Sequence, residues 1–228
     1  MDKSFKETYF DFSSIKSDIF VKATKETLYM TLWATFFVII IGLIIGLMLY
    51  YFGKSNKPVF KVLYGIVSVI SNTFRSIPFI ILIILLFPIT KAIIGTMLGA
   101  TAAIPALVIS AAPFYARLVE IAFREVDHGV LEASEAMGAT QTQIIFKVLI
   151  PESLPALISG VTVTTITMIG FTAMAGVIGA GGLGAVAYQA GFLGNNYTVI
   201  MVATILLLII VFIVQWLGDL LVKVTDKR

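Results

Sequence analysis

The chain has 228 residues, of which 59% are hydrophobic and only 13% are charged, and its mean hydropathy is +1.01. This composition excludes an ordinary water-soluble domain and indicates a protein of the lipid bilayer, while a formal net charge of +3 is too small to suggest nucleic-acid binding. Because the sequence contains no cysteine, disulfides, thiolate catalysis and cysteine-based metal sites are excluded too.

The long apolar runs predict an all-α membrane protein, because backbone groups in hydrocarbon must bond to one another within helices or a closed barrel. A helix needs about 20 apolar residues to cross the bilayer, and five stretches of the sequence satisfy this length. They cover residues 28–52, 62–87, 97–119, 154–178 and 198–222.

Residues 1–23 form a polar or amphipathic tail ahead of the first apolar run. Within residues 14–27, Ile15, Ile19 and Lys22 recur at helical spacing, which predicts a helix lying on the membrane surface; a mobile tail is the alternative. A cleavable signal peptide is not expected, because the first apolar run is too long for one.

The distribution of lysine and arginine predicts the orientation of the spans. Of the connections between spans, those on one side contain only Lys91, and those on the other side are basic. The positive-inside rule therefore places the basic side and the C-terminus in the cytoplasm and the N-terminus outside. Five lysines of the N-terminal tail oppose this orientation: Lys3, Lys6, Lys16, Lys22 and Lys25. The cations that favour it are Lys54, Lys57, Lys61, Arg117, Arg124, Lys147, Lys223, Lys227 and Arg228.

A polar helical hairpin is predicted over residues 130–151, between the third and fourth spans. Glu132 begins the run Glu-Ala-Ser, Gly138 allows a sharp reversal, Thr140 and Gln143 form a capping box, and Pro151 is expected to end the second helix. A DNA-binding helix-turn-helix is disfavoured, because residues 117–151 carry three basic against five acidic side chains. We therefore expect the hairpin to dock onto a soluble protein; the alternative is an amphipathic hairpin on the membrane surface.

Two nucleotide-binding patterns are misleading here. Residues 179–184 satisfy G-x-G-x-x-G, but membrane spans flank them and no acidic residue follows before Asp219, so a turn or a close helix contact is expected. Gly53-Lys54-Ser55 resembles the end of a phosphate loop, but Met48 stands where that loop requires glycine. The chain is thus expected to bind no ATP, and the lone His128 has no second ligand for a metal.

Polar residues within the spans are candidates for the transport path. Arg75 is the only charge well inside a predicted span. It is a candidate for bonding a substrate carboxylate or for a part in gating. The alternative is a structural role, in which it bonds carbonyls freed by Pro78 or pairs across a dimer. In the fourth span, Thr164, Met168 and Thr172 are candidates for lining the path, and helix packing is the alternative. The spans contain no catalytic constellation, so no enzyme activity is expected.

The hairpin resembles the coupling motif of permease subunits of ATP-binding-cassette importers of type I. In that motif Glu-Ala-Ala is followed by Gly, an aliphatic pair and Pro; here Ser134 replaces the second Ala and Ile150 replaces the usual Leu. Three further stretches are similar to the permeases of methionine importers, and with the five spans the likeness runs from about Thr24 to the C-terminus. These stretches are residues 72–82, residues 111–120, and residues 179–184 with Tyr188-Gln189.

The resemblance implies a type I importer permease fold over residues 24–215, followed by the end of the last span and a cytoplasmic tail over residues 216–228. It also implies a homodimer that works with two cytosolic ATPases and an external substrate-binding protein, with ATP and Mg²⁺ bound by the ATPase rather than by this chain. The implied substrate is D- or L-methionine or a close derivative, and the alternative substrate is another small amino acid. The alternative class of protein is an ion-coupled carrier that works without an ATPase. The resemblance implies docking of the binding protein at Gly179, Gly181, Gly182, Gly184 and Tyr188, and coupling to the ATPase through Glu132, Ala133, Ser134, Met137, Gly138, Ala139, Thr140 and Pro151.

Overall fold

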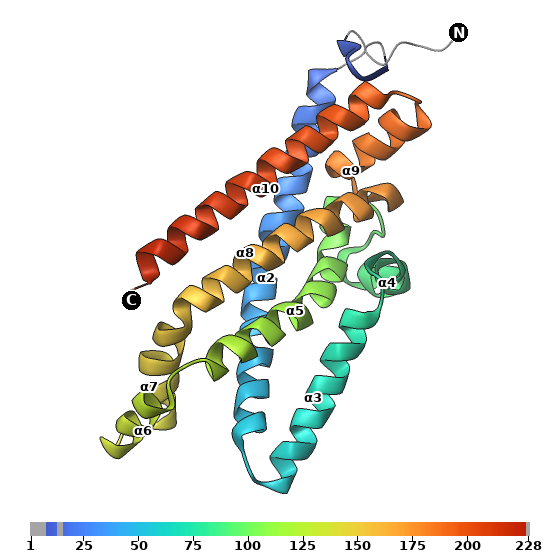
Figure 1. Cartoon of the computed structure of the whole chain (residues 1–228). Coiled ribbons are helices and arrows are strands. Elements are labelled where there is room, and N and C mark those ends of the chain that lie inside the picture. The colour runs from blue at the N-terminus through green and yellow to red at the C-terminus, as the bar shows by residue number, and fades with distance from the viewer. Residues whose placement is uncertain (1–7, 13–15, 227–228) are drawn as a thin grey trace. The chain divides into compact units, whose positions relative to one another are not determined.

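The computed structural model describes residues 8–12 and 16–226 of the chain. All regular secondary structure in these residues is helical, which confirms the all-α prediction (Figure 1). The chain forms two compact units: the first takes in Met1–Phe36, Ile77–Ser110 and Thr165–Val214, and the second Phe37–Ser76, Ala111–Thr164 and Gln215–Arg228. Each unit is described by itself.

Four stretches of the described chain are helical, long and apolar enough to cross a membrane, and a bent pair of helices makes a fifth candidate. The first is α2 (Ser17–Lys54), the second α5 (Ala100–Arg124) and the last α10 (Tyr197–Thr225). Between α5 and α10, a continuous stretch over Gln141–Ala180 contains α7 (Gln141–Ile144), the π-helical turn η2 (Ile145–Leu149), α8 (Ile150–Ala175) and the π-helical turn η3 (Gly176–Ala180).

The second predicted span, residues 62–87, is not one straight helix. It is divided between α3 (Pro58–Ser76) and α4 (Phe79–Ile94), which are bent by 109° at the break. The cause lies in Pro78, which has no N–H to donate and disfavours helical geometry in Ile77 before it. The hydroxyl of Ser76 also bonds back into the last turn of α3, donating to the carbonyl oxygen of Asn72 at 2.8 Å.

The first helix also differs from its prediction. α2 begins at Ser17 and runs without a break into the membrane span, so residues 17–27 of the expected surface helix are the first part of α2. Phe20 and Ala23 are buried in the core of the first unit, so one face of this segment packs within the protein. Lys3, Lys6 and Ile15 lie outside the described residues.

The first unit is built around a core of apolar side chains from α2, α8, the glycine-rich segment and α10. The glycine-rich segment consists of η3, the short helix α9 (Gly182–Val186) and the π-helical turn η4 (Ala187–Leu193). Phe79 of α4 stacks on Phe171 of α8, with 4.6 Å between ring centroids and 5° between ring planes. The core cluster contains Phe20, Ala23, Ile169, Leu183, Val199, Ala203 and Ile210.

In the second unit, glycines allow α2 to approach α5 closely. A Cβ atom on Gly42 would lie 2.6 Å from Cδ1 of Tyr115, and one on Gly46 would lie 2.6 Å from Cβ of Val119. The Tyr115 hydroxyl donates to the carbonyl oxygen of Leu157 at 3.5 Å, which joins α5 to α8. Small residues at such contacts are typical of helices packed within a membrane.

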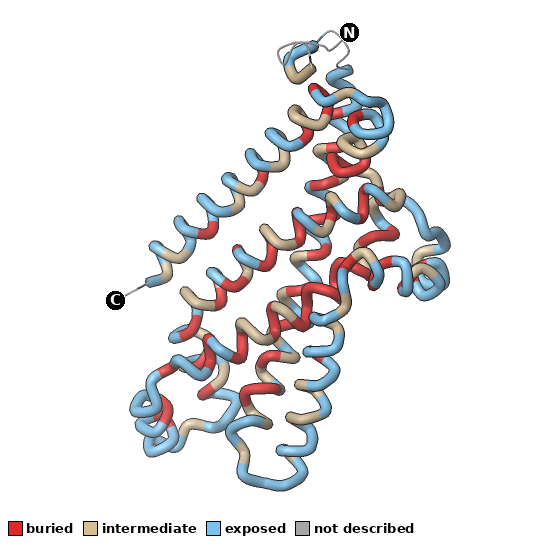
Figure 2. Tube along the Cα trace, turned by 45° about the vertical axis from the view of Figure 1, so that its right-hand side comes forward, coloured by how far each residue is buried: buried red, intermediate tan, exposed pale blue. Residues whose placement is uncertain are grey.

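Burial differs sharply between the candidate spans. In α5, 67% of an 18-residue apolar stretch is buried within the protein. In α10, only 22% of the corresponding stretch is buried (Figure 2). Large apolar side chains on α10 are exposed, including Phe212, Ile213 and Trp216. A helix that exposes apolar side chains along its length is suited to contact with lipid or with another membrane helix.

Candidate functional site

The first helix of the hairpin, α6 (His128–Ala136), begins at a side-chain cap. The carboxylate of Asp127 accepts a hydrogen bond from the backbone N–H of Gly129 at 2.6 Å. Leu131 and Ser134 are buried, and the Ser134 hydroxyl donates to the carbonyl oxygen of Val130 at 2.8 Å. The replacement of Ala by Ser in the motif is therefore accommodated by a bond within the helix.

The reversal after α6 depends on Gly138. Its φ of 81° lies in the left-handed region, and no heavy atom of another residue lies within 4 Å of the position of a Cβ. The N–H of Gly138 donates to the carbonyl oxygen of Glu135 at 2.9 Å, and that of Ala139 donates to Ser134 at 3.1 Å. This pair of bonds is the Schellman motif, so a glycine at this position is required by the backbone.

The second helix of the hairpin confirms the predicted capping box. The N–H of Thr140 donates to Oε1 of Gln143 at 2.8 Å, and the N–H of Gln143 donates to Oγ1 of Thr140 at 3.4 Å. The reciprocal bonds fix the start of α7 (Gln141–Ile144).

The predicted end of this helix at Pro151 is wrong. The chain passes from α7 through the π-helical turn η2 into α8, and Pro151 lies in the first turn of α8. Because proline has no N–H, the regular bond to the carbonyl four residues before it is absent. The chain remains helical since the N–H of Ile150 donates to the carbonyl oxygen of Ile145 and the Ser153 hydroxyl donates to that of Leu149 at 2.6 Å.

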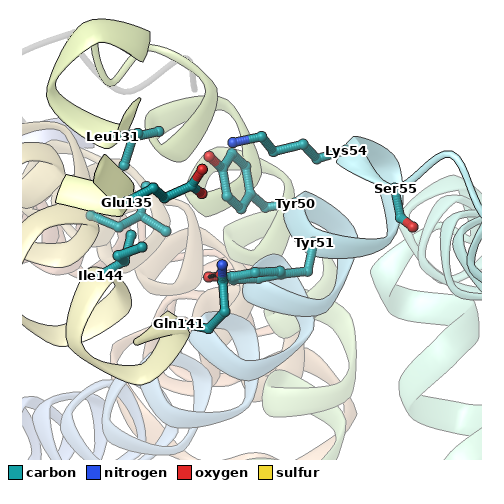
Figure 3. A pocket seen from close by; sticks show the side chains of 9 residues that line it. Tyr50, Tyr51, Lys54, Ser55, Leu131, Glu135, Gln141 and Ile144 are labelled. Carbon is teal, nitrogen blue, oxygen red and sulfur yellow. Dashed lines mark hydrogen bonds between the residues drawn. The ribbon is translucent and has the colours of Figure 1, made fainter. Parts of the chain in front are cut away.

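The hairpin lies against the C-terminal end of α2, with a cavity of about 190 Å³ between them (Figure 3). The Tyr51 hydroxyl donates to Oε1 of Gln141 at 3.2 Å. Figure 3 shows the Lys54 ammonium, the Tyr50 hydroxyl and the Glu135 carboxylate pointing toward one another. The apolar side of the cavity is formed by Leu131, Ile144 and Leu149.

The outer surface of the hairpin combines acidic and apolar side chains. Glu132, Ala133 and Thr140 are exposed, whereas the exposed Glu135 faces the cavity beside α2. Met137 is 82% exposed, and Phe146 on η2 is 66% exposed. Exposed apolar side chains beside exposed carboxylates give this surface the mixed character of a protein–protein interface, so it is suited to docking.

A buried ionic cluster lies in the same unit, and the sequence analysis missed it. The side chain of Glu120 is only 1% exposed, and its carboxylate bonds Nη1 of Arg117 at 2.6 Å and Nη2 of Arg124 at 2.7 Å. The Tyr64 hydroxyl of α3 also donates to this carboxylate, at 3.3 Å. The spacing of Arg117, Glu120 and Arg124 along one helical face was the signal that could have revealed the cluster.

The candidate path residues occupy different environments. Arg75 is exposed at the end of α3, and its guanidinium carbon lies 5.9 Å from the ring centroid of Phe114, a cation–π distance. The hydroxyl of Thr164 donates to the carbonyl oxygen of Gly160 and that of Thr172 to Ile169, each at 2.7 Å. Met168 is fully buried. Thr164 and Thr172 thus bond within α8, and the role of these side chains in a transport path stays a prediction.

The glycine-rich loop is a tight turn, as expected, and most of it is inaccessible. Gly179, Gly181 and Gly182 have positive φ angles, and Gly182 and Gly184 are buried, so these last two cannot meet a partner directly. Tyr188 is half-buried and stacks on Phe192 with 5.8 Å between centroids.

Two residues of α2 hold this loop in place. The N–H of Gly182 donates to Oε2 of Glu26 at 2.8 Å, and the N–H of Leu183 donates to Oγ1 of Thr27 at 2.9 Å. The loop therefore acts as a fixed junction of α2 and α9 within the first unit.

Helical spans joined to an exposed, glycine-turned hairpin define the class: a multi-span membrane protein with a polar hairpin between two of its spans. The model of the family described as "binding-protein-dependent transport system inner membrane component" matches residues 39–228, and the chain belongs to this family.

Similar proteins narrow the relationship further and confirm the resemblance to methionine importer permeases. The methionine import system permease protein MetP of Bacillus subtilis (strain 168) is 58% identical over 206 residues, which cover 90% of this chain and 93% of the relative. The probable D-methionine transport system permease protein MetI of Pasteurella multocida (strain Pm70) is 47% identical over 206 residues, covering 90% of this chain and 95% of the relative.

Solved structures support the same assignment. A chain of the MetNI methionine ABC transporter, in an inward-facing conformation, superposes with a TM-score of 0.88 at 46% identity and covers 92% of this chain and 97% of the solved chain. An amino acid ABC transporter with histidines superposes with a TM-score of 0.75 at 20% identity, covering 91% and 94% of the two chains, and shows the fold alone. The predicted type I importer permease fold is confirmed.

Proposed function

We propose that this chain is the permease subunit of an ATP-driven importer of methionine, D- or L-, or a close derivative. Two copies would form the path across the membrane, and a separate cytosolic ATPase would bind ATP and Mg²⁺ and hydrolyse the nucleotide. A substrate-binding protein outside the membrane would deliver the amino acid. The observation that carries the proposal is 58% identity to a methionine import permease over 90% of this chain.

The hairpin supports the coupling role in this proposal. Its exposed Glu132, Met137 and Gly138 are available to a groove of the ATPase, while buried Leu131 and Ser134 attach α6 to the rest of the unit. Closure of two ATPases on ATP would draw two hairpins together and turn the spans as rigid bodies. This requires the hairpin and the C-terminus to be cytoplasmic and the N-terminus external, the orientation that the lysine and arginine distribution favours.

The proposal is tested by replacing Gly138 with leucine in a complex reconstituted in vesicles with its ATPase and binding protein. We expect membrane insertion to persist and ATP-driven methionine uptake to be lost, because a leucine side chain would project into the docking groove. Gly95 provides a matched control: its φ is 86° and the space around it is open, as at Gly138, so Gly95→Leu has a similar backbone cost.

Three outcomes would refute parts of the proposal. Normal uptake by the Gly138→Leu complex would remove the coupling role of the hairpin. Uptake that follows a proton gradient and ignores the ATPase would favour an ion-coupled carrier. Transport of another small amino acid in preference to methionine would change the substrate and leave the mechanism intact.

A further inference from the structure

A second cavity, of about 270 Å³, opens in the second unit at the ends of α2 and α5. Both helices are candidate membrane spans, and they end at Lys54 and Arg124, so the cavity lies where the two spans leave the bilayer. Its volume is slightly below that of pockets for drug-sized ligands, which suits a small headgroup. The residues that line it are Tyr50, Gly53, Lys54, Phe123, Arg124, Val126 and His128.

The charge of the cavity lining favours an anion. Lys54 and Arg124 supply two cations, and none of the described residues that line the cavity is a carboxylate. Arg124 bonds Glu120 through Nη2, and since a guanidinium has five N–H donors, this bond leaves others for a ligand. Glu120 is also bonded to Arg117, so one carboxylate is shared by two arginines and the three side chains retain a net positive charge.

The walls of the cavity are preformed. The buried rings of Tyr50 and Phe123 meet edge to face with 5.7 Å between centroids. Gly53 leaves room for the Arg124 guanidinium beside them, because a Cβ there would lie 2.9 Å from Nη2 and the guanidinium would have to shift. The absence of a side chain at this position lets the guanidinium lie against the end of α2.

Apolar surface suited to acyl chains begins next to the cavity. Phe52, the neighbour of Gly53, stacks on Phe60 of α3 with 5.5 Å between centroids. Val59 and Val62 on the same helix are 67% and 62% exposed. A cationic, aromatic-walled cavity at the membrane boundary with an apolar surface beside it matches the chemistry of a lipid headgroup and its chains.

We propose that this cavity binds the phosphate group of an acidic phospholipid, with Lys54 and Arg124 as its cationic partners. Glu135 limits the affinity, because its carboxylate lines the neighbouring cavity together with Lys54 and points toward the Lys54 ammonium (Figure 3). Lys54 is therefore shared between Glu135 and the phosphate. The proposal is independent of which solute the protein transports.

The test measures lipid bound to the full chain by native mass spectrometry in detergent, with phosphatidylglycerol, phosphatidylcholine or inorganic phosphate as the probe. We expect phosphatidylglycerol to bind several-fold more tightly than phosphatidylcholine, whose choline group is repelled by the two cations. Lys54→Gln should weaken phosphatidylglycerol binding about fivefold, the effect of one cation at a membrane surface, and Lys54→Arg should restore it.

Two further variants sharpen the test. Lys57→Gln removes a neighbouring exposed cation that does not line the cavity and should leave binding unchanged. Glu135→Gln removes the competing carboxylate and should strengthen binding several-fold. If Lys54→Gln and Lys57→Gln weakened phosphatidylglycerol binding equally, the attraction would be a diffuse property of the surface and the proposal would be overturned. Weaker phosphatidylglycerol binding in Glu135→Gln would overturn it too. Inorganic phosphate that binds as tightly as phosphatidylglycerol would indicate a free anion rather than a lipid as the ligand.

Discussion

Nη2 of Arg124 lies 2.7 Å from Oε1 of Glu120, a carboxylate that is buried almost completely (1% exposed) in the second unit. Arg117 bonds the other carboxylate oxygen, and Tyr64 of α3 contributes its hydroxyl. A buried charge is tolerated only when its partners replace the water that it loses. The cluster therefore ties α3 to α5 at the end of a membrane helix.

Glu120→Gln should destabilise the protein, because the substitution removes the charge that compensates Arg117 and Arg124. Breaking a fully buried ion pair costs about 3–5 kcal/mol, and we expect about 2 kcal/mol here because the two arginine side chains are roughly half exposed, at 43% and 53%. The melting temperature in detergent measures the effect. Glu125→Gln, on an exposed neighbour, is the control, and an equal fall in both variants would contradict the role of the cluster.

Two threonines one turn apart on α2 should respond differently to the same substitution. Thr27 accepts a hydrogen bond from the N–H of Leu183 at 2.9 Å, and Thr27→Val would leave this buried N–H without an acceptor, at a cost of about 1–3 kcal/mol. Thr31 is also buried, and its hydroxyl has no hydrogen-bond partner among the described residues. Thr31→Val should therefore be neutral or stabilising.

Thermal unfolding of the two valine variants in detergent separates these effects. Loss of the hydrogen bond from Leu183 to Thr27 should also speed amide hydrogen exchange in the glycine-rich loop, so Thr27→Val should exchange faster there than the parent protein. A similar loss of stability in both variants would mean that the shape of the side chain, and not the bond to Leu183, determines the outcome.

Features set by neighbouring residues were predictable from the sequence. The hairpin follows from Gly138 and from the capping box of Thr140 and Gln143, because each depends on bonds that span five residues or fewer. The all-α class was predictable from the long apolar runs for a similar reason. Backbone N–H and C=O groups in lipid must form hydrogen bonds with one another, and a helix forms these bonds within one segment.

Features that depend on distant contacts, or on how a local break is resolved, were not predictable. The mean hydropathy is high on both sides of the break at Pro78, so it predicts one continuous span. The proline is present in the sequence, but hydropathy alone does not show that the helix is broken there. Pro151 predicts a helix end, but the chain stays helical through the π-helical turn before it. The bond between Glu26 and Gly182 joins residues 156 positions apart, and no local pattern records such a pairing.

Gly184 should be among the least replaceable residues of the first unit. A Cβ atom at this position would overlap with the backbone of Ala173, which cannot move aside as the end of a flexible side chain can. We expect Gly184→Ala to destabilise the protein by about 3 kcal/mol and to reduce the folded yield from membranes. Gly170→Ala on α8 is the matched control: its Cβ would meet open space, and the gain in helix propensity should be about 1 kcal/mol. Equal tolerance of the two substitutions would contradict the close contact of α9 with α8.

Thr140→Ala should loosen the hairpin without unfolding the membrane helices. The substitution removes the oxygen that accepts from the N–H of Gln143, and loss of such a cap costs about 1 kcal/mol, local to α7. We expect faster hydrogen–deuterium exchange over α6 and α7 and an unchanged global melting temperature, because α7 is held separately by its continuation into α8. Thr142→Ala, in the same turn but away from the cap, should leave exchange unaltered.

If the hairpin couples the ATPase to the spans, a looser hairpin transmits less displacement. Thr140→Ala should then also lower the amount of solute transported per ATP hydrolysed, while Thr142→Ala does not. Unchanged exchange in Thr140→Ala would mean that contacts with α2 and α8, rather than the capping box, hold the hairpin in shape.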